Sequence, residues 1–223
     1  MTAILVVLTI AVFLTVDYLH TRARRARATV PARLPLSASL APELFARPAG
    51  VFFGPGHTWA RLEPDGAVRI GIDDFAQKLL GRIERIEAAP AGVTLGPEDA
   101  AFVLHQQGKS AAFPAPIEGV VAAVNEAALG DPARLKGDPF GAGWLLLVKP
   151  KQLAEGLRRL RVAEEARAWM QEEVARLRDF LSAQVPADAV GATLQDGGVP
   201  VEGVFEHLDA KSWERFEVEF LVS

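Results

Sequence analysis

Between residues 50 and 150 the sequence alternates short apolar runs with glycine and proline turns, a pattern that favours a β-rich fold. The stretch HTWARLEPDGAVRIGI (57–72) holds two alternating runs around Pro64-Asp65-Gly66, a sequence typical of a tight turn. We therefore predict a hairpin here. Further short runs follow, and DDFAQKLLG (73–81) has the composition of a short helix that ends at Gly81. The spacing predicts a β-rich α+β class: a small barrel or sandwich with flanking helices.

The first nineteen residues, MTAILVVLTIAVFLTVDYL, contain one charged side chain, Asp17. At ~1.5 Å per residue such a helix crosses a hydrocarbon core of roughly 30 Å. We therefore predict a transmembrane helix over residues 1–20; a cleaved signal peptide and a buried helix of a soluble fold are weaker alternatives. Basic residues stay on the cytoplasmic side of a membrane, which predicts a single pass with the N-terminus outside and the main domain cytoplasmic. The arginines that follow the span are expected to contact anionic lipid: Arg22, Arg24, Arg25, Arg27 and Arg33.

Composition and periodicity divide the rest of the chain. Residues 21–49 are basic and contain several prolines, which favours an extended linker before the 50–150 domain. In residues 151–184 apolar side chains recur every three or four positions, which predicts an amphipathic helix packed on the barrel, interrupted at Gly156 or near Arg161-Val162. Residues 185–223 form a C-terminal extension of unknown role, in which Asp209 is expected to cap a short helix carrying Trp213 and Phe216.

The residue inventory excludes several kinds of chemistry. The net charge of −4 gives no electrostatic reason to expect nucleic acid as a partner, and the absence of cysteine excludes thiolate chemistry. The four histidines stand singly, without the spacing of a metal site, and the paired carboxylates Asp73-Asp74 are best explained as a helix cap. We therefore predict no catalytic residues, no metal site and no enzymatic activity of the chain's own.

Two long blocks of the sequence resemble the H-protein of the glycine cleavage system, between about His57 and Pro150. The resemblance implies a lipoyl/biotinyl-type β barrel-sandwich of two small sheets. It also implies a carrier that shuttles an aminomethyl or acyl group between enzymes on a lipoate attached to a hairpin lysine. The motifs that carry it are His57 and Trp59, Asp74-Phe75-Ala76-Gln77, Leu80-Gly81, Asn125-Glu126-Ala127, Asp131-Pro132, Asp138-Pro139-Phe140-Gly141 and Gly143-Trp144-Leu145.

The hairpin HQQGKSAAFPAP (105–116) departs from that family at the attachment position. Counted without gaps from Gly92 and from Ala115-Pro116, Gly108 occupies the slot of the family's lysine, and Lys109 stands one residue later. An alternating strand turns a one-residue slip into a change of face, although a turn containing glycine can absorb it. We expect Lys109 to be exposed at the hairpin tip, where it is the candidate lipoyl attachment site.

Two functions remain open from the sequence. In the first, the protein is a membrane-anchored lipoyl carrier that docks on partner enzymes through the barrel. In the second, it is a non-lipoylated scaffold or docking module that recruits a cytoplasmic protein partner to the membrane, where tethering raises the local concentration of that partner. The sequence identifies neither the partners nor the oligomeric state.

Overall fold

The computed structural model describes residues 42–96, 99–183 and 202–221. The predicted transmembrane helix and most of the predicted linker lie outside these ranges, and no helix within them is long and apolar enough to cross a bilayer. In chain order the strands are β1 (Phe52–Phe53), β2 (Thr58–Leu62), β3 (Val68–Ile72), β4 (Arg85–Ala88), β5 (Thr94–Leu95), β6 (Ala100–Gln106), β7 (Lys109–Pro114), β8 (Gly119–Val124) and β9 (Leu146–Pro150). The helices are η1 (Pro42–Leu44), α2 (Asp74–Leu80), α3 (Glu126–Gly130), α4 (Ala133–Gly137), α5 (Leu153–Arg158), α6 (Ala163–Ala183), η3 (Val204–His207), α7 (Ala210–Phe216) and η4 (Glu217–Leu221).

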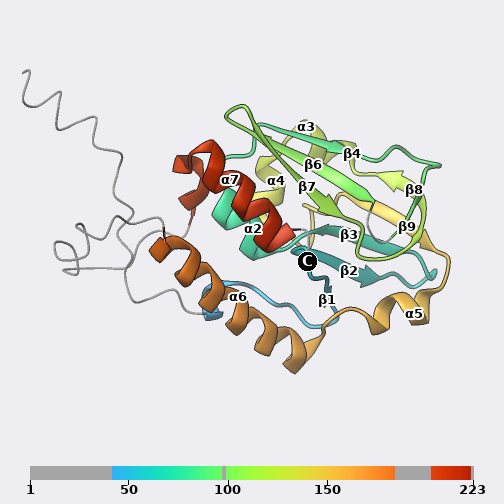
Figure 1. Ribbon diagram of the computed structural model, residues 1–223. Coiled ribbons are helices and arrows are strands. Elements are labelled where there is room, and N and C mark those ends of the chain that lie inside the picture. Colours follow the sequence, from blue (N-terminus) through green and yellow to red (C-terminus); the bar gives the residue numbers. More distant parts are fainter. Residues whose placement is uncertain (1–41, 97–98, 184–201, 222–223) are drawn as a thin grey trace, which may run out of the picture. The chain divides into compact units, whose positions relative to one another are not determined.

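The strands form two antiparallel sheets, as the sequence pattern predicts. One has six strands in the order β1-β2-β3-β9-β8-β5, and the other has three in the order β4-β6-β7 (Figure 1). The predicted hairpin is β2–β3, with Thr58 opposite Ile72 and Leu62 opposite Val68. Gly66, with φ of 86°, completes its turn in a conformation that glycine adopts without a steric penalty.

Helix α2 begins and ends where the sequence indicates. The Asp73 carboxylate accepts a hydrogen bond from the backbone N–H of Ala76 at 2.9 Å, which confirms its interpretation as an N-cap. At the other end, Gly81 has φ of 75° and donates its N–H to the Gln77 carbonyl. Phe75, Leu79 and other side chains of this helix are buried, so α2 belongs to the core.

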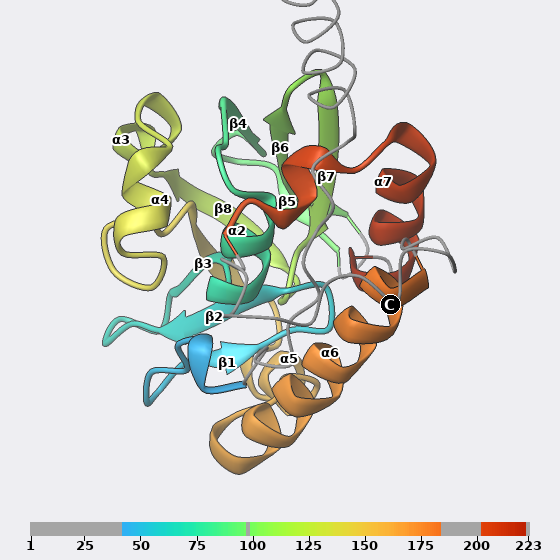
Figure 2. The same cartoon turned by 90° about the vertical axis from the view of Figure 1, so that its left-hand side faces the viewer.

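The predicted helix over residues 151–184 is present as α5 and α6, with the break near Arg161-Val162 rather than at Gly156. The break arises because Arg161 leaves the helical path to exchange two backbone hydrogen bonds with Phe53, at 2.8 and 2.9 Å. Helix α6 then packs on the barrel as predicted, running alongside it in Figure 2. The Trp169 ring lies 6.3 Å from that of Phe53, and the Arg161 guanidinium lies over the Trp169 ring. Its buried face consists of Ala166, Trp169, Met170, Glu173, Val174, Leu177, Phe180 and Leu181.

The end of the predicted linker, residues 42–49, lies within the described residues. From Pro42 onward the chain packs on the domain: Phe45 is 1% exposed and its ring lies 4.8 Å from that of Phe75. The Ala46 N–H donates to Asp74, and Lys78 donates to the Leu44 carbonyl. One aromatic side chain in a proline-containing stretch is enough to fix its end, because it buries a large apolar area.

A buried ion cluster joins the barrel to α6. His57 is fully buried in a left-handed conformation with φ of 57°; its Nδ1 lies 2.9 Å from Asp73 and its Nε2 lies 3.4 Å from Glu173 of α6. The ring stacks on Phe75 at 4.3 Å, and Arg176 forms an ion pair with the same Glu173. Burial alone would lower the pKa of His57, but the two carboxylates outweigh it and raise that pKa to about 9. Perturbed groups often mark active sites, but this one is enclosed on all sides and is structural.

The cluster predicts a loss of stability at alkaline pH. Because the pKa of His57 is raised from 6.5 to about 9 on folding, its contribution is complete below pH 6.5 and disappears as the pH rises through about 9. The full effect corresponds to roughly 3 kcal/mol. Denaturant unfolding at a series of pH values measures it, and a flat profile between pH 6.5 and 9.5 would contradict the assignment.

The matched variants for this measurement are Glu173→Gln and Glu172→Gln, since Glu172 is the exposed neighbour on the same helix. Removing the buried charge is expected to cost about 1–3 kcal/mol at neutral pH and to shift the alkaline loss to lower pH. The exposed substitution is expected to change the free energy of unfolding by less than about 0.5 kcal/mol.

Candidate functional site

The candidate attachment hairpin is the β6–β7 pair, closed by the two-residue turn Gln107-Gly108. Both turn residues have positive φ, 48° and 75°, which is the backbone geometry of the tight turns that suit the twist of a hairpin. Gln106 and Lys109 are the last paired residues. Lys109 is therefore the first residue of β7, and Gly108 occupies the exposed turn.

The position of Lys109 in the strand decides where its side chain lies. Along β7 the side chains of Ala111 and Phe113 are buried, whereas Ser110 and Ala112 are exposed. Strand alternation places Lys109 on the buried side. The one-residue offset from Gly108 puts Lys109 on this face, where it is half-buried rather than fully exposed as expected.

The amine of Lys109 is held by residues from the C-terminal part of the chain. Its Nζ donates to the Leu208 carbonyl and, at 3.4 Å, to the Glu206 carbonyl, and it lies 5.2 Å from the centre of the Trp213 ring. Burial lowers the pKa of this amine, and the nearby carboxylate of Asp209 opposes that shift. The amine thus has polar and aromatic partners on its own chain.

The C-terminal segment (residues 202–221) is fixed to the domain at points other than Lys109. The Gly203 N–H donates to the Lys78 carbonyl at 2.7 Å, which satisfies an end carbonyl of α2. The Glu206 carboxylate accepts from the Arg82 N–H at 2.7 Å. Gly81 and Gly203 approach so closely that a Cβ on Gly81 would lie 2.4 Å from the Cα of Gly203. Glycine is therefore required at this contact.

Aromatic side chains complete the docking of this segment. Asp209 caps α7 as predicted, accepting from the Ser212 N–H at 2.7 Å, and Trp213 and Phe216 are buried. The Trp213 indole N–H donates to the Ser110 carbonyl of β7 at 2.8 Å. Phe220 is fully buried, with its ring 6.2 Å from Phe75 of the barrel and 5.7 Å from Phe180 of α6. Figures 1 and 2 both show α7 beside the β6–β7 hairpin.

As held in this structure, the hairpin does not fit an attached lipoyl arm. A carrier lysine must offer its amine to solvent so that enzymes can reach it and the arm can move. Here the exposed turn position is Gly108, which has no side chain, and the amine of Lys109 already donates to two carbonyls beneath Trp213.

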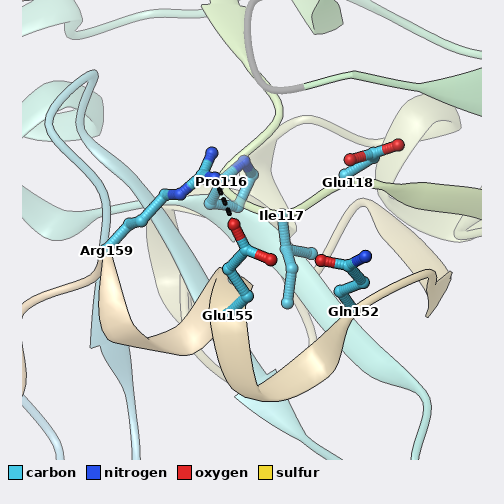
Figure 3. A pocket seen from close by; sticks show the side chains of 7 residues that line it. Pro116, Ile117, Glu118, Gln152, Glu155 and Arg159 are labelled. Carbon is cyan, nitrogen blue, oxygen red and sulfur yellow. Dashed lines mark hydrogen bonds and ion pairs between the residues drawn. The ribbon is translucent and has the colours of Figure 1, made fainter.

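A small hollow lies on the surface of the described structure, away from the Gln107-Gly108 turn. This hollow of about 50 Å³ lies between α5 and the loop 116–118, where Arg159 pairs with Glu155 at 2.9 Å (Figure 3). Ligand pockets usually measure about 300–1,000 Å³, so this hollow is too small. In the described ranges no group of three His, Cys, Asp or Glu residues is arranged to hold a metal ion. The Nε2 atom of His105 lies 3.4 Å from a carboxylate oxygen of Glu87.

Comparisons with known proteins agree with this architecture. The family model described as glycine cleavage H-protein matches residues 52–173. The chain is 41% identical over 108 residues to glycine cleavage system H protein 2 of Pseudomonas putida, covering 48% of this chain and 84% of that protein. It is 39% identical over 108 residues to the H protein of Neisseria meningitidis serogroup B, with the same coverages.

A solved structure is similar as well. The crystal structure of a glycine cleavage system H protein from Mycobacterium marinum superposes with a TM-score of 0.50 at 29% identity, covering 56% of this chain and 98% of that one. The fold is therefore the lipoyl-type β sandwich of H-proteins, whose members carry lipoate on a lysine and have no catalytic activity of their own. The family model matches more than half of the chain, and the relatives and the sheet order agree with it. The chain therefore belongs to the glycine cleavage H-protein family.

Proposed function

We propose that this protein is a membrane-anchored docking module of the H-protein family, which binds a cytoplasmic protein partner and carries no lipoate on Lys109. The observation that supports the proposal most directly is the bound state of the lysine amine, which donates to the carbonyls of Glu206 and Leu208 under the Trp213 ring. Docking requires only the surface of the fold, whereas group transfer requires a free arm.

The membrane anchor in this proposal rests on the sequence of residues 1–20 and on the arginines that follow. A carrier that serves several soluble enzymes gains little from confinement to a membrane surface. A docking module gains more, since tethering raises the local concentration of one membrane-associated partner. The anchor therefore favours the docking role over the carrier role.

Membership of a lipoyl carrier family supports a second candidate function. Lys109 directly follows the turn of the same hairpin, so a swing of its side chain away from Trp213 would bring the amine toward solvent. In this alternative the barrel docks on glycine cleavage enzymes and delivers the group carried on Lys109. The two candidate functions differ in whether Lys109 carries a covalently attached lipoyl group.

Intact-mass measurement of the full chain provides that separation. Expressed with lipoylation enzymes and excess lipoate, the protein is expected to keep its unmodified mass, while a co-expressed H protein of Neisseria meningitidis gains the lipoyl group. Gly108→Lys, at a turn position where a Cβ has nothing within 4 Å, is expected to accept the group on the new amine. A lipoyl group on Lys109 of the unsubstituted chain would exclude the docking-only role.

Membrane fractionation tests the anchor. The full chain is expected to stay with membranes through alkaline and high-salt washes, and a variant lacking residues 1–20 is expected to move to the supernatant. The control replaces Arg22, Arg24, Arg25 and Arg27 by glutamine: a spanning helix keeps this variant in the membrane, whereas purely electrostatic adsorption would be lost in salt. Release of the full chain by high salt alone would contradict a transmembrane anchor.

A further inference from the structure

The C-terminal segment lies outside the family match, which ends at residue 173, yet it covers the hairpin on which the family's chemistry depends. We infer that residues 202–221 are a built-in cap on the β6–β7 hairpin, which keeps the amine of Lys109 from acylating reagents and modifying enzymes until the cap is displaced. This goes beyond the proposed docking role, which requires no cap.

The Lys109 amine contacts three groups of the C-terminal segment. Two backbone carbonyls from the end of η3 accept from Nζ, and the centre of the Trp213 ring lies 5.2 Å from it. Backbone carbonyls are fixed as long as residues 206–208 keep their conformation, so the acceptors stay in place, and the amine is freed only when the lysine side chain swings out or the cap is displaced. The amine is thus occupied by the fixed part of the cap.

The cap is held on the domain independently of Lys109. Gly203, Glu206 and Phe220 anchor it to α2, to the loop after α2 and to the core between the barrel and α6. Phe205, Phe216 and Phe220 are each completely buried. The cap is therefore held in place by these contacts, and its position does not depend on the Lys109 side chain.

The cap also contacts the edge of the three-stranded sheet at β7. β7 is an edge strand of the three-stranded sheet, and free edge carbonyls are natural pairing sites for another chain. The Trp213 indole N–H occupies the Ser110 carbonyl of this edge. The cap therefore covers both the amine and the adjacent strand edge.

Competitive acetylation of the full chain tests the cap without any lipoylation enzyme. In the reaction with the N-hydroxysuccinimide ester of acetic acid, the neutral amine attacks the ester carbonyl, N-hydroxysuccinimide leaves and one proton is released. The rate at each lysine is measured by peptide mass spectrometry. Lys109 is expected to react roughly tenfold or more slowly than the exposed Lys149, because it reacts only from an opened state.

Protonation does not explain such a difference. Burial lowers the pKa of Lys109, which raises the neutral fraction of the amine and would by itself speed the reaction. Slow acetylation therefore reports blocked access. Equal rates at Lys109 and Lys149 in the unsubstituted protein would overturn the inference.

Variants in the cap complete the test. Trp213→Ala removes both the ring over the amine and the bond to Ser110, and is expected to raise the Lys109 rate several-fold or more while Lys149 keeps its rate. Glu214→Gln, an exposed position on the same helix, is the matched control and should change neither rate. An unchanged Lys109 rate in Trp213→Ala would refute the cap. Lipoylation of Lys109 in the unsubstituted chain together with slow acetylation by the small ester would refute the docking-only role but leave the cap in place as a barrier that the ligase displaces.

Discussion

The interaction on which the functional assignment depends is the contact between the Lys109 amine and the carbonyls of Glu206 and Leu208. Hydrogen bonds from a charged donor are worth about 1.5–3 kcal/mol, and a cation over an aromatic ring adds about 0.5–1 kcal/mol. Swinging the side chain out thus costs a few kcal/mol, and each 1.4 kcal/mol lowers the population of the open form about tenfold. Releasing the whole segment costs more, since burial of one phenylalanine contributes about 1.5–3 kcal/mol.

The C-terminal segment, which the family match does not cover, packs on the elements that the match does cover. The family match covers the two sheets, α2 and the first half of α6, and these elements keep the architecture of an H-protein. The residues after the match supply the aromatic side chains that fill the space between the barrel and α6. Since function resides in sites rather than in folds, family membership alone does not fix the role of Lys109.

Features determined by neighbouring residues in the sequence could be predicted. The turn at Gly66 and the caps at Asp73 and Asp209 depend on contacts within three or four residues, and all are present. The helix break near Arg161 was one of two places indicated by the pattern.

Features that depend on contacts between residues far apart in the sequence could not be predicted. Glu173 lies in a charge-rich helix and gave no sign that it is buried against His57, and the partners of Lys109 lie about 100 residues further along the chain. Strand alternation could have indicated that Lys109 is not fully exposed. Once the position of the turn is known, alternation alone places Lys109 on the buried face of β7. Phe45, similarly, packs on Phe75 across a separation that composition does not encode.

Hydrogen–deuterium exchange of the native full chain tests most directly whether the C-terminal segment is docked on the domain. Docked as described, the amides of Gly203 and of α7 are predicted to be strongly protected, because they exchange only when the segment opens. Exchange of α7 at the rate of an unstructured peptide, alongside a protected barrel, would contradict the account.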